Sequence, residues 1–269
     1  MRPEILEACA GFRLSLPRSL ASGHAGDKVG RGTGSSVEFI DFREYVPGDD
    51  LRHVDWRSYA RTDQLHVRLF REEVAPRVDI VLDASASMAS TAAKARALRD
   101  LGLALAVWAR DSGSTARWLA AGGAQVADPE TLALAGAPEG LLPEEPLRPR
   151  GLRAVVSDFL AAGDPAPWLR RLAAGAAHLY VIHLLDPWEL VPTSDGPHTL
   201  VDCETGERAD VDLSAGVIAS YRERLQRLID GVRECVQRLA GTYALVPAGP
   251  PRAMFREHLL PQGLLEPDA

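Results

Sequence analysis

The chain has 269 residues, of which 46% are hydrophobic and 25% are charged, and its formal net charge is −7. This composition is typical of a globular protein with one large domain or a domain plus a smaller module. The negative charge disfavours nucleic acid and anionic membranes as the main partners. No apolar run approaches the roughly 18 residues of a membrane helix, and no signal-peptide core is present at the start. We therefore expect a cytoplasmic protein without membrane insertion.

The three cysteines give no evidence of a disulfide framework or a zinc site. Cys9, Cys203 and Cys235 form no CxxC pair, and an odd number cannot pair completely within one chain. This usage fits a reducing compartment.

Residues 1–75 predict a small β-rich N-terminal module. A short helical start is followed by a Gly-rich stretch between Gly23 and Gly34 and then by a dense charged and aromatic block. Within that block, residues 64–70 alternate as a half-buried strand does. The glycines are not followed by Lys-Ser or Lys-Thr and do not lie between a strand and a helix, so a P-loop is not predicted.

From residue 76 onward, apolar strands alternate with amphipathic helices. Helices are expected over 91–110, from Pro167, and over 215–240, and a hairpin over 198–212; residues 136–150 are Pro-rich and predict a loop. The expected strands are 77–83, 115–120, 152–157, 178–185 and 242–246. Such alternation is typical of an α/β fold with a mostly parallel sheet flanked by helices. We assign this domain to residues 76–250 and a C-terminal tail to residues 251–269.

The loop that follows the strand over 77–83 carries the clearest chemical signal. Asp83, Ser85 and Ser87 place one carboxylate and two hydroxyls at alternate positions directly after a buried strand. Hard oxygen ligands of this kind suit Mg²⁺ or Mn²⁺. Parallel sheets also bind ligands at the carboxyl ends of their strands. The alternative is that these residues only form the turn that starts the next helix.

A second carboxylate, Asp158, follows the strand over 152–157 in the same predicted sheet. Its strand end can face the same edge as Asp83, which would complete a partial octahedral shell of carboxylates and hydroxyls. The alternative is again a local role, in which Asp158 caps the turn after its strand.

Two sets of residues resemble known families. The pattern Asp83-x-Ser85-x-Ser87 with Asp158 resembles the metal-ion-dependent adhesion site (MIDAS) of von Willebrand factor A domains. The upstream segment resembles the signature of the bacterial family called domain of unknown function 58, through Glu38, Phe39, Asp41, Arg43, Tyr45, Pro47, Gly48, Asp49, Arg52, Asp55, Trp56 and Arg61.

The resemblance implies a von Willebrand A-like (Rossmann-like) domain joined to the N-terminal module. It also implies a bound Mg²⁺ or Mn²⁺, a protein partner whose carboxylate completes the site, and a MoxR-type AAA+ ATPase as that partner. The adhesion site further uses a threonine from an intermediate loop, for which Thr115 and Thr131 are the candidates here.

The upstream block leaves three interpretations open. Its acids could form a second metal or hydrolytic site, with His53 beside Asp55 as the acid/base. Its arginines could bind a nucleotide phosphate. Alternating Arg and Asp residues more commonly form ion pairs, which favours a structural or interaction module.

Catalysis has little support in the sequence. No Gly-x-Ser-x-Gly elbow and no HExxH spacing is present, so no catalytic residue is assigned. We therefore expect a non-enzymatic interaction or adaptor protein with a metal-assisted binding face. A metal-dependent hydrolase built on the acidic N-terminal block and a metal-free structural scaffold are the alternatives.

Overall fold

The computed structural model describes residues 2–15, 37–72, 77–135, 140–160, 163–193 and 196–268. The chain divides into two compact units, one made of residues 1–15 with 76–269 and the other of residues 16–75. The Gly-rich stretch between Gly23 and Gly34 lies outside the described residues.

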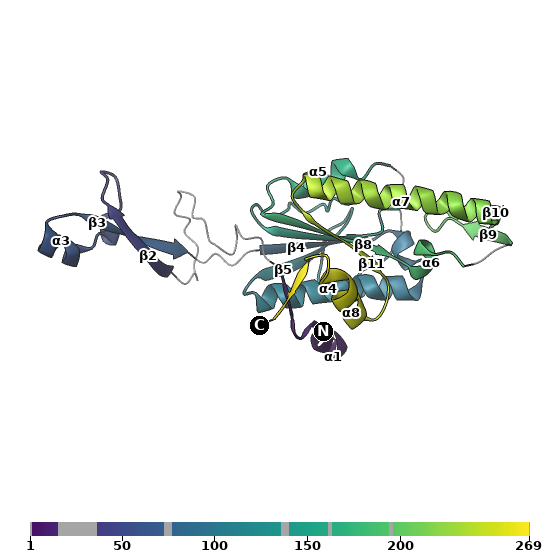
Figure 1. Ribbon diagram of the computed structural model, residues 1–269, viewed down its shortest axis with the longest axis horizontal. Coiled ribbons are helices and arrows are strands. Elements are labelled where there is room, and N and C mark those ends of the chain that lie inside the picture. Colours follow the sequence, from purple (N-terminus) through teal and green to yellow (C-terminus); the bar gives the residue numbers. More distant parts are fainter. Residues whose placement is uncertain are drawn as a thin grey trace. The chain divides into compact units, whose positions relative to one another are not determined.

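A six-stranded sheet forms the centre of the larger unit (Figure 1). Its strand order is β11-β8-β7-β4-β5-β6, with the first five strands parallel and β6 antiparallel at the edge. The strands are β4 (Arg77–Leu82), β5 (Thr115–Ala120), β6 (Gln125–Val126), β7 (Leu152–Ser157), β8 (His178–Leu185) and β11 (Thr242–Pro247). The α/β fold and the five parallel strands expected from the sequence are confirmed.

The central strands are buried on both faces, which explains their continuous apolar sequences. Every residue of β7 is buried, and so are all residues of β4 except Arg77. The one acid in β4, Asp79, is fully buried and forms ion pairs with Arg117 and Arg148. A buried carboxylate is tolerated because these guanidinium groups balance its charge.

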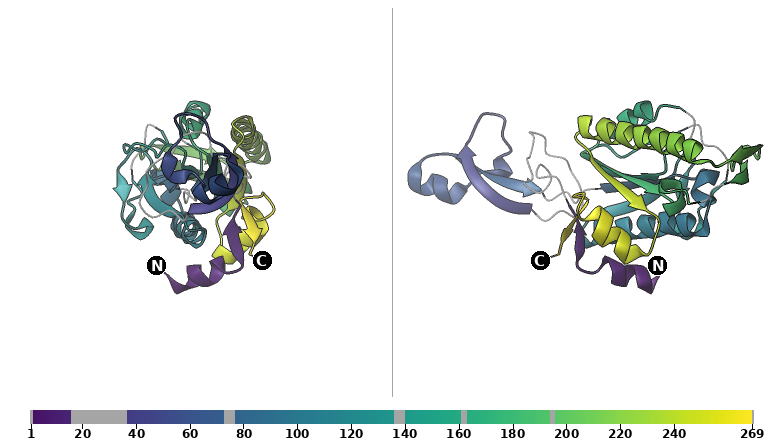
Figure 2. Two further views of the ribbon diagram at one scale, coloured as in Figure 1. Left: turned by 90° about the vertical axis from the view of Figure 1, so that its left-hand side faces the viewer. Right: turned by 45° about the vertical axis from the view of Figure 1, so that its right-hand side comes forward.

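Helices cover both faces of the sheet, with α4 on one side and α5 and α7 on the other (Figures 1 and 2). The helices are α4 (Ala92–Asp111), α5 (Ala166–Ala173) and α7 (Ala215–Arg238). Thr91 and Ser214 start α4 and α7 by accepting backbone hydrogen bonds as N-caps. The apolar side of α7, which includes Val232 and Val236, packs into the same core as α5.

Both ends of the chain are built into the larger unit. Helix α1 (Pro3–Cys9) buries Ile5 completely, and β1 (Phe12–Leu14) pairs with β12 (Leu265–Pro267). Residues 1–15 therefore belong to the larger unit rather than to a module over 1–75. The expected tail, 251–269, contains α8 (Pro251–Ala253), the π-helical segment η4 (Met254–Leu259) and β12. Apolar burial at both ends accounts for the difference.

Shorter elements complete the larger unit. Three short helices join its main elements, and the expected hairpin forms from β9 (Pro197–Val201) and β10 (Arg208–Asp212). The short helices are η2 (Ala86–Ala89), η3 (Pro129–Thr131) and α6 (Pro187–Leu190). Within the described part of the chain, no helix combines the length and the apolar character needed to cross a membrane.

The smaller unit contains an antiparallel pair of strands, β2 (Val37–Glu44) and β3 (His66–Glu72). Between them lie η1 (Leu51–His53) and α3 (Trp56–Thr62). Asp55 caps α3 by accepting hydrogen bonds from the backbone amides of Arg57 and Ser58. The strand expected over 64–70 is thus present at 66–72.

Candidate functional site

The candidate site lies where the order of strands in the sheet reverses. The chain passes from β4 to β5 on one side and later returns to form β7 on the other side of β4. Helix α4 follows β4 on one face of the sheet, whereas α5 follows β7 on the opposite face. The loops after β4 and β7 therefore diverge. Crevices of this kind are the usual ligand sites of open α/β sheets.

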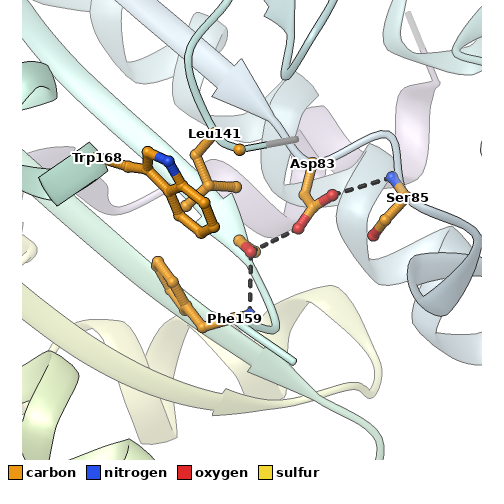
Figure 3. Close-up of a pocket in the computed structure, with 7 residues that line it drawn as sticks. Asp83, Ser85, Leu141, Phe159 and Trp168 are labelled. Carbon is orange, nitrogen blue, oxygen red and sulfur yellow. Dashed lines mark hydrogen bonds between the residues drawn. The ribbon is translucent and has the colours of Figure 1, made fainter. Parts of the chain in front are cut away.

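Asp83 leaves β4 directly into this crevice and is almost completely buried. Its Oδ1 atom accepts a hydrogen bond of 2.9 Å from the Ser85 amide, and its Oδ2 atom accepts one of 2.5 Å from Ser157 Oγ. Figure 3 shows Asp83 between Ser85 and the end of β7. The carboxylate is thus fixed from both strands, while each oxygen retains further acceptor capacity.

The two serine hydroxyls of the loop lie together beside Asp83. Ser85 Oγ and Ser87 Oγ are 2.8 Å apart, and both residues are buried. A small cavity of about 10 Å³ adjoins Asp83 and Ser85 and is closed on its other side by Leu141, Phe159 and Trp168 (Figure 3). The structure thus brings together three of the four predicted ligands in one loop.

Burial makes the Asp83 carboxylate electrostatically unfavourable. Its pKa is raised mainly by burial and further by the negative charge of Asp158, while hydrogen bonds from Ser157 and Ser85 partly offset this. A cation placed beside the two carboxylates would stabilise their ionised forms. The local charge is therefore of the sign that a divalent cation complements.

Asp158 follows β7 and is also buried, but its oxygens have partners within the protein. Its Oδ1 atom accepts from the Leu160 amide at 2.9 Å, and its Oδ2 atom accepts from Lys94 Nζ at 2.8 Å. The next residue, Phe159, has a positive φ of 54°, a strained conformation for a bulky residue.

The two candidate threonines lie in different elements, and Thr115 is not beside Asp83. Thr115 begins β5 and pairs with Arg77, which puts it at the amino edge of the sheet, opposite Asp83. Thr131 ends η3, where its hydroxyl donates to Asp128 O. The position of Thr115 follows already from the expected strand over 115–120, because the first residue of a parallel strand lies at the amino edge of the sheet.

The upstream residues lie in the smaller unit and largely form ion pairs. Arg43 holds Asp49 through two hydrogen bonds of 2.7 and 2.6 Å, and Arg52 holds Asp50. Asp55 caps α3 and lies 3.3 Å from Arg68. These ion pairs agree with the interpretation of the upstream block as a structural or interaction module. A hydrolytic site would instead need carboxylates that are free to act on a substrate.

The remaining signature residues have local positions. Tyr45, Pro47 and Gly48 form the turn after β2, and Trp56 and Arg61 lie on α3, where Trp56 is exposed. Asp41 lies in β2 and accepts a hydrogen bond from the Phe42 amide. Glu38 and Phe39 belong to β2, and His53 ends η1. Among the described residues, no three His, Cys, Asp or Glu side chains gather closely enough to hold a metal.

Sequence reasoning missed a buried network next to Asp158. Lys94 is fully buried on the first turn of α4 and contacts both Asp158 and Glu189. Asp186 accepts a hydrogen bond from Thr91 and forms a reciprocal capping box with Glu189. The sequence carried two signals for the network: a lysine in the first turn of a helix, which opposes the helix dipole, and the capping-box spacing of Asp186 and Glu189.

Comparisons with known proteins agree with the upstream signature. The chain is 29% identical over 265 residues to uncharacterized proteins from Mycobacterium bovis and from two strains of Mycobacterium tuberculosis, covering 85% of this chain and 82% of each relative. A solved structure, that of the conserved hypothetical protein BatB from Bacteroides thetaiotaomicron, covers 65% of this chain and 91% of its own, with 14% identity and a TM-score of 0.34. The family model described as "Protein of unknown function DUF58" matches residues 41–128 and 116–230. The chain therefore belongs to the DUF58 family.

Proposed function

We propose that this protein is a non-enzymatic adaptor that binds a protein partner through a divalent cation at the carboxyl edge of its sheet. The observation that carries the proposal is the buried carboxylate of Asp83 beside the paired hydroxyls of Ser85 and Ser87. These groups lie at the strand-order reversal, where an α/β sheet offers a ligand site.

The geometry of the loop suits Mg²⁺ or Mn²⁺. In an octahedral shell with metal–oxygen distances of about 2.1 Å, neighbouring ligand atoms lie roughly 3 Å apart. The Oγ atoms of Ser85 and Ser87 are 2.8 Å apart, so they could occupy adjacent positions with little movement. Asp83 would supply the charged ligand, because each of its oxygens can still accept.

Asp158 would act from farther away. Its two oxygens already accept from Leu160 N and Lys94 Nζ. Because the Lys94 ammonium lies 2.8 Å from Asp158 Oδ2 and would repel a cation bound directly beside it, Asp158 would meet the cation through a water molecule. A site with one charged and two neutral protein ligands binds weakly and leaves coordination positions open.

A bound divalent cation would supply an open position for a carboxylate of the partner. Ser85 and Ser87 would set the direction of the open coordination position, and Asp83 would hold the cation in place. The resemblance to von Willebrand A domains supports this mode of binding. It also suggests a MoxR-type AAA+ ATPase as the partner, a step that rests on family analogy alone.

The same geometry favours binding over catalysis. The hydroxyls of Ser85 and Ser87 contact each other, and the Ser157 hydroxyl donates to Asp83 from a completely buried position. His183, which pairs with Ser157 across β7 and β8, is buried, and its ring nitrogens contact Asp158 O and the Tyr243 hydroxyl. No serine–base pair open to a substrate occurs among the described residues of this edge.

Partner capture tests the proposal. Immobilised wild-type protein should retain a partner from the native cell in Mg²⁺ and release it in EDTA, while the Asp83→Asn variant should retain none in either buffer. Asp111→Asn is the matched control, because Asp111 is 58% exposed and ends α4, at the opposite end of the helix from Lys94; this variant should behave as wild type. A partner held equally by wild type and Asp83→Asn in EDTA would contradict metal-assisted binding and favour a metal-free scaffold.

A further inference from the structure

The side chain of Lys94 is the least expected feature of the larger unit. It is 0% exposed, although lysines are rarely buried and an ammonium in the first helical turn opposes the helix dipole. Its burial is tolerated because Nζ lies 2.8 Å from Asp158 Oδ2 and 2.7 Å from Glu189 Oε1. Burial alone would lower the pKa of Lys94, but the two carboxylates outweigh it and raise the pKa. The lysine is therefore a fixed internal cation.

The two carboxylates held by Lys94 belong to different parts of the molecule. Asp158 lies at the end of β7 in the candidate metal site, whereas Glu189 lies in the four-residue helix α6. One ammonium thus connects the site to α6. We propose that Lys94 is a positioning residue that couples occupancy of the metal site to helix α6, an inference that rests on the metal-assisted binding proposed above.

Helix α6 is suited to respond because side-chain contacts hold it, Lys94 among them. Glu189 Oε2 accepts from the Asp186 amide at 2.7 Å, and the Glu189 carbonyl accepts from Tyr221 Oη at 2.8 Å. Thr91 Oγ1 donates to Asp186 at 2.7 Å. A helix of four residues has no stability of its own, so these side-chain contacts determine its position.

The outer side of α6 presents apolar surface next to the site. Trp188 is 41% exposed, and Val191, which follows the helix, is 53% exposed. A partner that places a carboxylate at the site would meet this surface. A change in α6 would therefore alter the surface that the partner contacts.

The coupling follows from charge. A divalent cation beside Asp83 attracts the Asp158 carboxylate and repels the Lys94 ammonium. Both effects weaken the contact between Lys94 and Asp158 and leave Lys94 free to shift with Glu189. Removal of the Lys94 ammonium should tighten metal binding, because a repelling charge is lost. It should also make the position of α6 independent of metal binding.

Calorimetry with Mn²⁺ and hydrogen–deuterium exchange over residues 186–191 test the proposal on the full chain. In wild type, saturating Mn²⁺ should speed exchange in this segment about tenfold. In Lys94→Met, exchange should be fast with and without Mn²⁺, and Mn²⁺ should bind more tightly than in wild type. Glu189→Gln removes the charge that pairs with Lys94 and also weakens the capping bond to the Asp186 amide, so exchange in α6 should be fast and insensitive to Mn²⁺ even if Lys94→Met fails to fold.

Arg117→Met is the matched control because it removes a buried ion pair with Asp79 that lies within the sheet. It should lower thermal stability but keep the Mn²⁺ response of residues 186–191. Wild type that binds Mn²⁺ without any change in α6 exchange would overturn the coupling and leave the proposed function intact. Weaker Mn²⁺ binding by Lys94→Met would equally overturn it, since a merely structural lysine gives that result. Wild type that binds no Mn²⁺ would overturn the proposed function itself.

Discussion

Ser157 Oγ donates a hydrogen bond of 2.5 Å to Asp83 Oδ2 and thereby joins the ends of two neighbouring strands. Both residues are buried, and the hydroxyl also accepts from the Phe159 amide at 3.0 Å. This single hydroxyl fixes the Asp83 carboxylate and the turn that carries Asp158. The candidate site is thus organised by the ends of two strands together with the loop that follows β4.

Asp83→Asn should stabilise the metal-free protein. Since the pKa of Asp83 is raised by burial, its ionised form is less favourable in the folded than in the unfolded chain at neutral pH. Asparagine can still accept from the Ser85 amide and can donate to Ser157 Oγ, without the charge. We expect thermal unfolding in EDTA to shift upward by a few degrees, or about 1 kcal/mol. A lower melting temperature would show that the charge is compensated within the protein.

His183 should make the fold sensitive to acid. Burial lowers its pKa from 6.5 to about 4, and the positive charges of Lys94 and Arg233 act in the same direction, against Asp158. Between pH 6.5 and 4 the unfolded chain therefore binds a proton that the folded chain does not, so the free energy of unfolding falls as pH falls. This residue should contribute a loss of about 1–3 kcal/mol across that range.

The measurement for His183 is urea unfolding at several pH values between 4 and 7. His183→Gln retains a donor for Asp158 O but cannot titrate, so its stability should depend less steeply on pH than that of wild type. Identical slopes for the two proteins would contradict the prediction.

Gly140 is needed for the close approach of Trp168. A Cβ atom at residue 140 would lie 2.7 Å from Trp168 Nε1, in the wall of the cavity beside Asp83. Gly140→Ala should therefore destabilise the fold by about 1–3 kcal/mol. Gly231→Ala is the control: it lies in α7 with open space around it and should be neutral or stabilise by up to about 1 kcal/mol. Chemical denaturation measures the free energy of unfolding of both variants. Equal changes in the two would contradict a specific need for glycine beside Trp168.

The N-terminal helix should contribute to the stability of the larger unit. Ile5 on α1 is 0% exposed, whereas its neighbour Leu6 is 42% exposed. Ile5→Ala should lower the free energy of unfolding by about 2–5 kcal/mol, and Leu6→Ala should change it by less than about 0.5 kcal/mol. Differential scanning calorimetry measures both. An Ile5→Ala variant as stable as wild type would place residues 1–15 outside the larger unit.

The sequence predicted the sheet well because its central strands are continuous apolar runs. It also located Asp83 and Asp158 at strand ends, since both follow directly after such runs. It could not locate contacts that depend on tertiary packing. Lys94 reaches Asp158, 64 residues away, only through the packing of α4 on the sheet.

The domain boundaries also depend on tertiary contacts. Residues 1–15 were grouped with the upstream block because they precede it in the sequence. Their burial against α4 and the pairing of β1 with β12 depend on contacts across almost the entire chain. No local pattern encodes such contacts.

Isothermal titration of Mg²⁺ and Mn²⁺ into the full chain tests the candidate site most directly. The account predicts one bound cation per chain for wild type and for the control Asp111→Asn, whose site of substitution ends α4 far from Lys94. It predicts at least about tenfold weaker binding for Ser85→Ala and no measurable binding for Asp83→Asn. Wild-type protein that binds neither cation, or an Asp83→Asn variant that binds them as wild type does, would contradict it.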